Sequence, residues 1–161
     1  MRKAVADRAG KARLHLSEEN NGDHRIYDSK DGRRFIEVKC VRLDDYFRDY
    51  RERIAFIKMD IQGAGPGEIR GMSSLLERCK NLRMVVEFWP FGLKRFGVGA
   101  KEFLRLLNGH GYSLYNADER KGRVEPADIE TLASTYDPEQ EVEYTNLLCE
   151  KGAKRRESLS P

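Results

Sequence analysis

Two acidic residues stand where this sequence could carry out chemistry. Asp60 lies at the end of the apolar run 54–61, and Glu87 lies near the end of the next run, 84–88. A carboxylate in such a run is costly to bury unless it is paired, hydrogen-bonded or faces a cleft. Neighbouring parallel strands lie about 4.8 Å apart, so both carboxylates could reach one substrate hydroxyl or one Mg2+ ion. The structural alternative, a turn cap at Asp60 and an ion pair at Glu87, remains open.

The segment after Asp60 is rich in glycine and invites comparison with phosphate-binding loops. Residues 62–67 read QGAGPG, which matches neither GxxxxGK[ST] nor GxGxxG and lacks the P-loop lysine. We therefore favour a tight, shaped turn over a phosphate cradle. A nucleotide site at 63–67, in another class of α/β enzyme, remains an alternative. Trp89, in the aromatic segment after Glu87, either lines a substrate pocket or covers the end of the sheet.

The pattern of apolar residues predicts alternating strands and helices. Nearly continuous apolar runs, as at 54–61 and 84–88, are typical of strands buried on both faces of a parallel sheet. Apolar residues at helical spacing predict helices over 69–79 and 100–107. Further strands are expected at 12–16, 35–41, 112–115 and 144–149. This order predicts an α/β fold with a parallel sheet, in which the last two strands, lacking a helix between them, could pair antiparallel.

Charge balance and cysteine content exclude several classes of protein. The 161 residues carry 30 basic and 27 acidic side chains, and a net charge of +3 gives no electrostatic argument for nucleic acid. The three cysteines are far apart and form no CxxC pair, which argues against a disulfide framework and for a reducing compartment. No apolar run reaches the roughly 20 residues of a membrane span. We expect a cytoplasmic protein with neither a membrane nor a nucleic-acid partner.

The middle of the chain resembles the FkbM-type methyltransferases. VRLDDYF at 41–47 is followed by IAFIKMDIQGAGPGEIRGMSSLL at 54–76 and by MVVEFWP at 84–90. In that family a Leu-Asp-Asp element precedes a strand ending Lys-x-Asp-[Val/Ile]-[Glu/Gln]-Gly, and then a helix that carries a Gly. A second acid often follows in a Glu-Gly-x-Glu pattern, where this chain has Gly65. The resemblance runs from about Lys3 to Lys151 and is most specific in its middle.

The resemblance implies a fold and an activity. The fold would be α/β, with an incomplete doubly wound, Rossmann-like and mostly parallel sheet and flanking helices. Residues 1–151 would form the carboxyl-terminal part of a class I methyltransferase domain, and 152–161 a disordered tail. The activity would be methyl transfer from S-adenosylmethionine to a hydroxyl of a small molecule or sugar, with Mg2+ as a candidate second cofactor.

The resemblance also assigns roles to single residues. Asp60 would be the catalytic base or a metal ligand, and Glu87 its partner or a group that orients the substrate. Gln62 and Trp89 would contact the substrate. Residues 3–6 resemble the third strand of the family, and at its end the adjacent residues Ala6 and Asp7 would touch the adenine of the cofactor, although Asp7 also suits a turn.

One part of the family pattern has no counterpart in the sequence. Such enzymes begin with a strand that ends in a Gly-rich turn, which approaches the methionine end of the cofactor, and nothing before Lys3 matches it. We therefore expect a chain that is inactive by itself and that exposes an apolar sheet edge. Such an edge predicts a homo-oligomer. The same edge is consistent with an alternative function, that of a non-catalytic assembly module that completes its sheet by oligomerisation.

Overall fold

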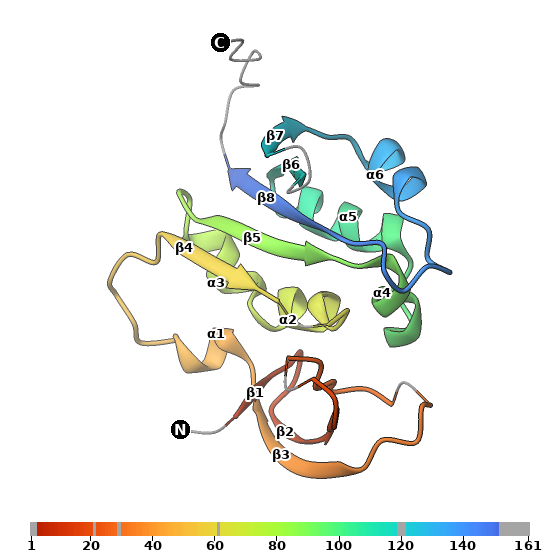
Figure 1. Ribbon diagram of the computed structural model, residues 1–161. Coiled ribbons are helices and arrows are strands. Elements are labelled where there is room, and N and C mark those ends of the chain that lie inside the picture. The colour runs from red at the N-terminus through yellow and green to blue at the C-terminus, as the bar shows by residue number, and fades with distance from the viewer. Residues whose placement is uncertain (1–2, 21, 29, 61, 119–121, 152–161) are drawn as a thin grey trace.

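The computed structural model describes residues 3–20, 22–28, 30–60, 62–118 and 122–151 of the chain, so the tail expected at 152–161 lies outside the described residues. Within them the chain forms eight strands and six helices, distributed over two sheets (Figure 1). In chain order they are β1 (Ala4–Val5), β2 (Gly10–His15), β3 (Phe35–Val41), α1 (Leu43–Tyr46), β4 (Phe56–Met59), α2 (Gly65–Gly71), α3 (Ser73–Arg78), β5 (Arg83–Phe88), α4 (Pro90–Phe96), α5 (Ala100–Gly109), β6 (Tyr112–Asp118), β7 (Arg123–Pro126), α6 (Ile129–Thr135) and β8 (Thr145–Lys151).

The larger sheet has five strands in the order β4-β5-β8-β6-β7. β4 pairs parallel with β5, while β8 lies between β5 and β6 and runs antiparallel to both. β7 forms an antiparallel hairpin with β6. The antiparallel pairing expected for the last two predicted strands is therefore confirmed.

The expectation of a mostly parallel sheet is corrected by these pairings. Among the described strands of the larger sheet, one of the four pairings is parallel and the other three involve β8 or β7. The physical reason lies in the connections, because a parallel pair needs a crossover of a dozen or more residues, usually helical. Helices precede β5 and β6 in the chain, as such crossovers require. β7, in contrast, is the hairpin partner of β6, and β8 runs antiparallel to both of its neighbours.

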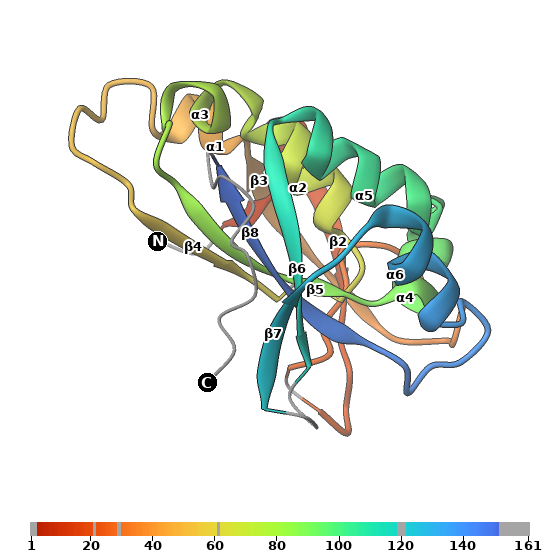
Figure 2. The same ribbon diagram turned by 90° about the horizontal axis from the view of Figure 1, so that it is seen from above.

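The helices lie on one face of the five-stranded sheet. Figure 2 shows α2, α3 and α5 together on this face, and no described helix covers the other. The alternation along β5 follows from this arrangement: Met84, Val86 and Phe88 are fully buried under the helices, while Val85 and Glu87 point to the opposite face and are partly exposed. The side chain of Glu87 therefore lies on the face of the sheet that no described helix covers.

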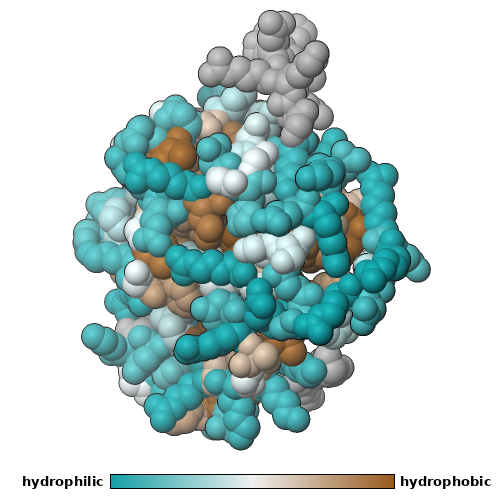
Figure 3. All heavy atoms as spheres, turned by 180° about the vertical axis from the view of Figure 1, so that it is seen from behind, coloured by the Kyte–Doolittle hydropathy of each residue, from teal (hydrophilic) through white to brown (hydrophobic). Residues whose placement is uncertain are grey.

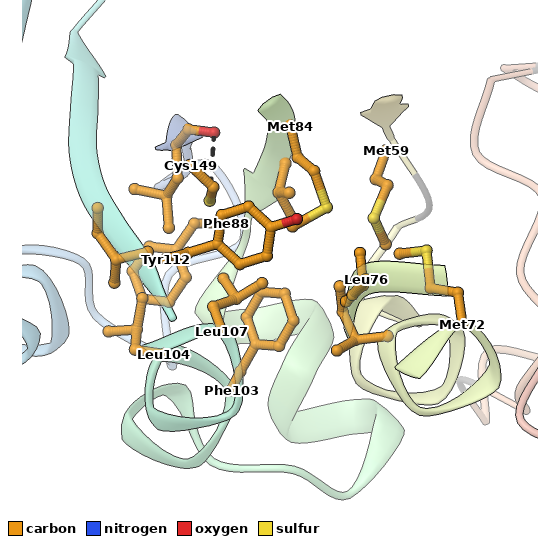
Figure 4. Packing of buried hydrophobic residues seen from close by; sticks show 14 of the residues in the cluster. Met59, Met72, Leu76, Met84, Phe88, Phe103, Leu104, Leu107, Tyr112 and Cys149 are labelled. Carbon is orange, nitrogen blue, oxygen red and sulfur yellow. Dashed lines mark hydrogen bonds between the residues drawn. The ribbon is translucent and has the colours of Figure 1, made fainter. Parts of the chain in front are cut away.

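The core fills the space between this sheet and its helices. Strand side chains such as Met59, Met84 and Phe88 meet helix side chains such as Leu76 and Leu107 (Figure 4). All five are at most 4% exposed. Seen from behind, the molecular surface is mainly hydrophilic with smaller apolar areas (Figure 3). No helix among the described residues has the length and apolar character needed to cross a membrane.

The smaller sheet has the order β1-β3-β2 and lies beside α1 and α2 (Figure 1). β1 is parallel and β2 antiparallel to β3. The end of β1 rests on α2, since a Cβ atom built on Gly71 would lie 2.2 Å from the carbonyl oxygen of Ala6. The long connection from β2 to β3, residues 16–34, we call the excursion. It starts with an isolated bridge between His15 and Arg25.

Glu68, in the first turn of α2, is a carboxylic acid largely removed from water. Burial raises its pKa to about 8, and burial is the only cause. When folding raises the pKa of a carboxyl, the free energy of unfolding is highest below the unfolded-state pKa. It falls as the pH rises from there through the folded-state pKa. For Glu68 the window runs from about 4.5, the ordinary value, to about 8.

We expect Glu68→Gln to match the wild type in free energy of unfolding near pH 4 and to exceed it by about 4 kcal/mol near pH 8, since one pKa unit corresponds to about 1.4 kcal/mol. Urea unfolding at several pH values measures the difference. Glu77→Gln is the matched control, because Glu77 is exposed on α3. A Glu68→Gln difference that fails to grow with pH would contradict the burial of this acid.

Candidate active site

The turn after β4 has an unusual backbone. Gln62 has a φ of 52° and Gly63 a φ of 87°, so two consecutive residues adopt left-handed conformations. Gln62 is not among the residue types, such as asparagine, that favour this region, so the conformation costs free energy that surrounding contacts must offset. Gly63 packs against the start of α4 so closely that an added Cβ atom would lie 2.4 Å from the carbonyl carbon of Gly92. The turn is therefore fixed by contact between two backbones.

Glu87 lies beside this turn at the end of β5. Its Oε2 accepts a hydrogen bond of 3.1 Å from the backbone N–H of Gln62. Burial and, after it, the charge of Asp60 raise the pKa of Glu87, the N–H groups of Gln62 and Gly63 lower it, and the resulting pKa is about 7. Near neutral pH the carboxyl is thus divided between its acid and base forms, which suits proton transfer.

Asp60 lies on the same edge of the sheet but in a different environment. Its side chain is 52% exposed, and its Oδ2 lies 3.5 Å from the Nζ atom of Lys58. The side-chain amide of Gln62 donates to Oδ1 at 3.3 Å. The structure therefore brings Asp60 and Glu87 together, as the strand ends predict, and the charge of Asp60 acts on the pKa of Glu87. Of the two, Glu87 has the environment of a base near neutral pH.

The excursion forms a further wall of this site, which sequence reasoning missed. The hydroxyl of Tyr27 donates a hydrogen bond of 2.7 Å to the backbone carbonyl of Gln62. Asp23 accepts from Arg25 at 2.8 Å and from Arg33 at 2.6 Å, and this ion pair network ties the excursion together. Residues 17–34 read as a polar, turn-rich segment, and no local signal distinguishes Tyr27 within it.

Trp89 connects the site to the segment before β8. Its ring is 5% exposed, and its Nε1 donates to the backbone carbonyl of Glu141 at 2.7 Å. The guanidinium of Arg25, itself 3% exposed, lies 5.0 Å from the ring centroid. These contacts hold the excursion, β5 and the segment before β8 together. Contact between Trp89 and a substrate stays a prediction, and little of the ring is left exposed for it.

Ala6 and Asp7, expected near the adenine of a cofactor, lie at the end of β1. The N–H of Ala6 donates to Val41 at 3.0 Å, and its carbonyl faces Gly71 of α2. Asp7 is exposed. β1 belongs to the smaller sheet, so these residues are not hydrogen-bonded neighbours of β4 and β5. Their role toward a cofactor stays a prediction.

The Gly-rich turn itself offers no cradle for a nucleotide. Residues 63–67 are buried, and a Cβ atom on Gly67 would lie 3.3 Å from the ring of Phe96. Glycine here permits close packing of the turn against α4 and leaves no room for a phosphate at Gly63. Among the described residues, no group of three or more His, Cys, Asp or Glu side chains could hold a metal ion. Asp60 as a Mg2+ ligand therefore stays a prediction without further support.

Comparison with known proteins agrees with the resemblance noted in the sequence. The model of the Methyltransferase FkbM domain matches residues 3–114, which include β1 to α5, the excursion, Asp60 and Glu87. Neither the curated proteins nor the solved structures include a match to the chain. Because the family model covers more than half of the chain, the expected family is confirmed: this protein belongs to the FkbM methyltransferase domain family.

Proposed function

We propose that this chain carries the acceptor side of a methyltransferase site, in which Glu87 takes the proton from a substrate hydroxyl. The observation that carries the proposal is the state of that carboxyl: it is partly buried at a strand end, accepts a hydrogen bond from the backbone N–H of Gln62, and has a pKa of about 7. A group with a pKa near the working pH combines enough basicity with a large deprotonated fraction. The family match supplies methyl transfer as the reaction class.

The chemistry required of the chain is small and local. S-adenosylmethionine would supply an electrophilic methyl group on sulfur. The acceptor oxygen would form a bond to this carbon as the carbon–sulfur bond breaks, S-adenosylhomocysteine would leave as a neutral thioether, and the proton of the acceptor hydroxyl would pass to the Glu87 carboxylate. The N–H of Gln62 holds the carboxylate in place, and burial together with the charge of Asp60 raises its pKa, so it is a stronger base than an ordinary glutamate. Alignment of the acceptor contributes the remaining rate effect.

The described residues fit the acceptor better than the cofactor. Glu87 is positioned for a hydroxyl proton, whereas the Gly-rich turn at 63–67 is filled by α4. Ala6 and Asp7 remain the candidates for the adenine. The proposal therefore assigns proton transfer to this chain and gives it no residue for the methionine end of the cofactor. A small-molecule or sugar hydroxyl is the proposed acceptor class, and Mg2+ has no part in the proposed step.

The direction of three strands supports a Rossmann-like origin for the larger sheet. β4 and β5 are parallel, and β5 and β6 each run antiparallel to β8, so β4, β5 and β6 point the same way. Their carboxyl ends lie on one edge of the sheet, which is where ligands bind in open α/β sheets. Glu87 and Asp60 lie on that edge.

S-adenosylmethionine binding provides the direct test, and it decides between the proposed function and the expectation of a chain that is inactive by itself. We expect the melting temperature to rise with S-adenosylmethionine, by the equivalent of about 2.7 kcal/mol at a hundredfold excess over the dissociation constant. We also expect the labelled methyl group to appear on one or more members of a panel of phenols and monosaccharides. Absence of both signals at saturating cofactor would overturn the proposed function.

The alternative, an assembly module, is favoured by the edge of the larger sheet. β4 is an edge strand, its second side is unpaired within the described residues, and Phe56 on it is 55% exposed. Such an edge can pair with a second copy of the chain. In that case the melting temperature would depend on protein concentration and ignore S-adenosylmethionine, and sedimentation would detect a dimer. The same experiment therefore separates the two functions.

A further inference from the structure

The peptide between Gln62 and Gly63 is held on both sides by residues from distant segments. A trans peptide is planar, and its carbonyl oxygen and N–H point in opposite directions. The oxygen of this peptide accepts the hydroxyl of Tyr27 at 2.7 Å, the N–H of Gln62 donates to Glu87 at 3.1 Å, and the N–H of Gly63 faces the same carboxyl and lowers its pKa. Tyr27 and the Glu87 carboxylate thus lie at opposite ends of one rigid unit.

The same peptide is strained and closely packed. Gln62 has a φ of 52°, which a residue other than glycine adopts at a cost. Gly92 lies against the Cα atom of Gly63 and prevents it from moving toward α4. The hydrogen bond from Tyr27 acts against relaxation of this conformation. A donor at the carbonyl also polarises the N–H at the other end, which strengthens its bond to a carboxylate.

Tyr27 is suited to a permanent donor role. Burial raises its pKa to about 12, so its hydroxyl keeps its proton throughout the neutral range. Its ring packs edge-on against Phe96 of α4, with centroids 5.6 Å apart, which fixes the direction of the hydroxyl. Removing the hydroxyl alone leaves this ring contact in place, so a Tyr27→Phe variant isolates the hydrogen bond.

We propose that Tyr27 is a positioning residue, which holds Gln62 and the peptide that follows it so that the N–H groups of Gln62 and Gly63 stabilise the ionised Glu87 carboxylate. The excursion is then part of the catalytic apparatus. This inference rests on the proposed function for its meaning in catalysis. The contact it predicts can be measured without cofactor or acceptor.

The experiment is a pH titration of the Glu87 side-chain carboxyl by carbon NMR in the full chain. We expect Tyr27→Phe to raise the pKa of Glu87 by about 0.5 to 1 unit, since lost donors to the charged form disfavour it. Amide exchange at Gly63 should accelerate about tenfold as the bond opens more often. A purely structural role would lower the melting temperature and leave the Glu87 titration unchanged, which would overturn the proposal.

Two further variants keep the result interpretable. Tyr136→Phe is the matched control, because it removes a hydroxyl that shares hydrogen bonds with Asn116, from a ring that packs on Phe88 rather than beside Glu87. It should leave the titration unchanged. Gln62→Asn places a residue that tolerates left-handed backbone in the turn. In that background Tyr27→Phe should shift the Glu87 pKa by less than half as much, and an equal shift would count against the orienting role.

These outcomes are distinct from failure of the proposed function. A chain that binds no S-adenosylmethionine but shows the Tyr27 effect would keep the contact and lose the methyltransferase assignment. A chain that transfers methyl groups but shows no Tyr27 effect would keep the activity and lose the positioning role.

Discussion

Glu87→Gln should lower the rate of methyl transfer by about 100-fold or more, the usual contribution of a positioned general base. Glutamine keeps the shape of the side chain and can still accept the N–H groups of Gln62 and Gly63, so the fold should be preserved. The wild-type rate should rise with pH through a midpoint near 7, because the base form of Glu87 increases there. The rate of label transfer from S-adenosylmethionine to the acceptor, measured across this pH range, gives both results.

Asp60→Asn is the informative companion to this variant. The charge of Asp60 raises the pKa of Glu87, so its removal should move the midpoint of the pH–rate profile to lower pH while activity persists. If Asp60→Asn abolished activity and Glu87→Gln kept more than half of it, the assignment of base and partner would have to be reversed. This is the order that the family resemblance first suggested, with Asp60 as the base.

Gly63→Ala should destabilise the fold by about 3 kcal/mol or more, because two costs add. The residue has a φ of 87°, which alanine adopts at a cost. Its new Cβ atom would also lie 2.4 Å from the carbonyl carbon of Gly92, so one of the two backbones would have to move. Urea unfolding monitored by circular dichroism measures the loss. The same variant should disturb Glu87, whose carboxylate depends on the N–H of this residue.

Gly97→Ala separates the two costs. Gly97 has a similar φ of 91° at the end of α4, and nothing lies within 4 Å of its added Cβ atom. It should therefore lose only the conformational part, about 1 kcal/mol. Equal losses in the two variants would mean that the contact between Gly63 and Gly92 contributes little.

The elements that the sequence predicts well are those with a strong local pattern. The strand expected at 35–41 coincides with β3, and the helix expected at 100–107 lies within α5. The helix expected over 69–79 is divided, because the backbone leaves the helical region at Met72, where φ is −126°. Gly71, which allows β1 to approach, ends the first part.

Two helices were missed although their start signals are present. Proline is favoured in the first turn of a helix, and α4 begins at Pro90. Asp128 caps α6 by accepting from the N–H of Thr131 at 2.8 Å. In both cases the signals at the helix start outweigh weak apolar periodicity.

The residues of the candidate site also differ in how well the sequence predicts them. Asp60 and Glu87 follow from a local rule, acids at the ends of buried strands. Tyr27 does not, because its bond to Gln62 joins residues 35 positions apart and depends on how the excursion folds back. The raised pKa of Glu87 also needs the structure, since it arises from burial and from neighbours on other segments.

The position of β8 has a consequence for how the protein is made. β8 follows every other described strand in the sequence, yet it lies in the middle of the larger sheet, between β5 and β6. Until its residues have left the ribosome, β5 and β6 each present an open edge to other chains. Pairings so distant in sequence also form slowly. Nascent chains should therefore depend on chaperones late in synthesis, and premature termination before Thr145 should yield aggregates rather than a smaller folded protein.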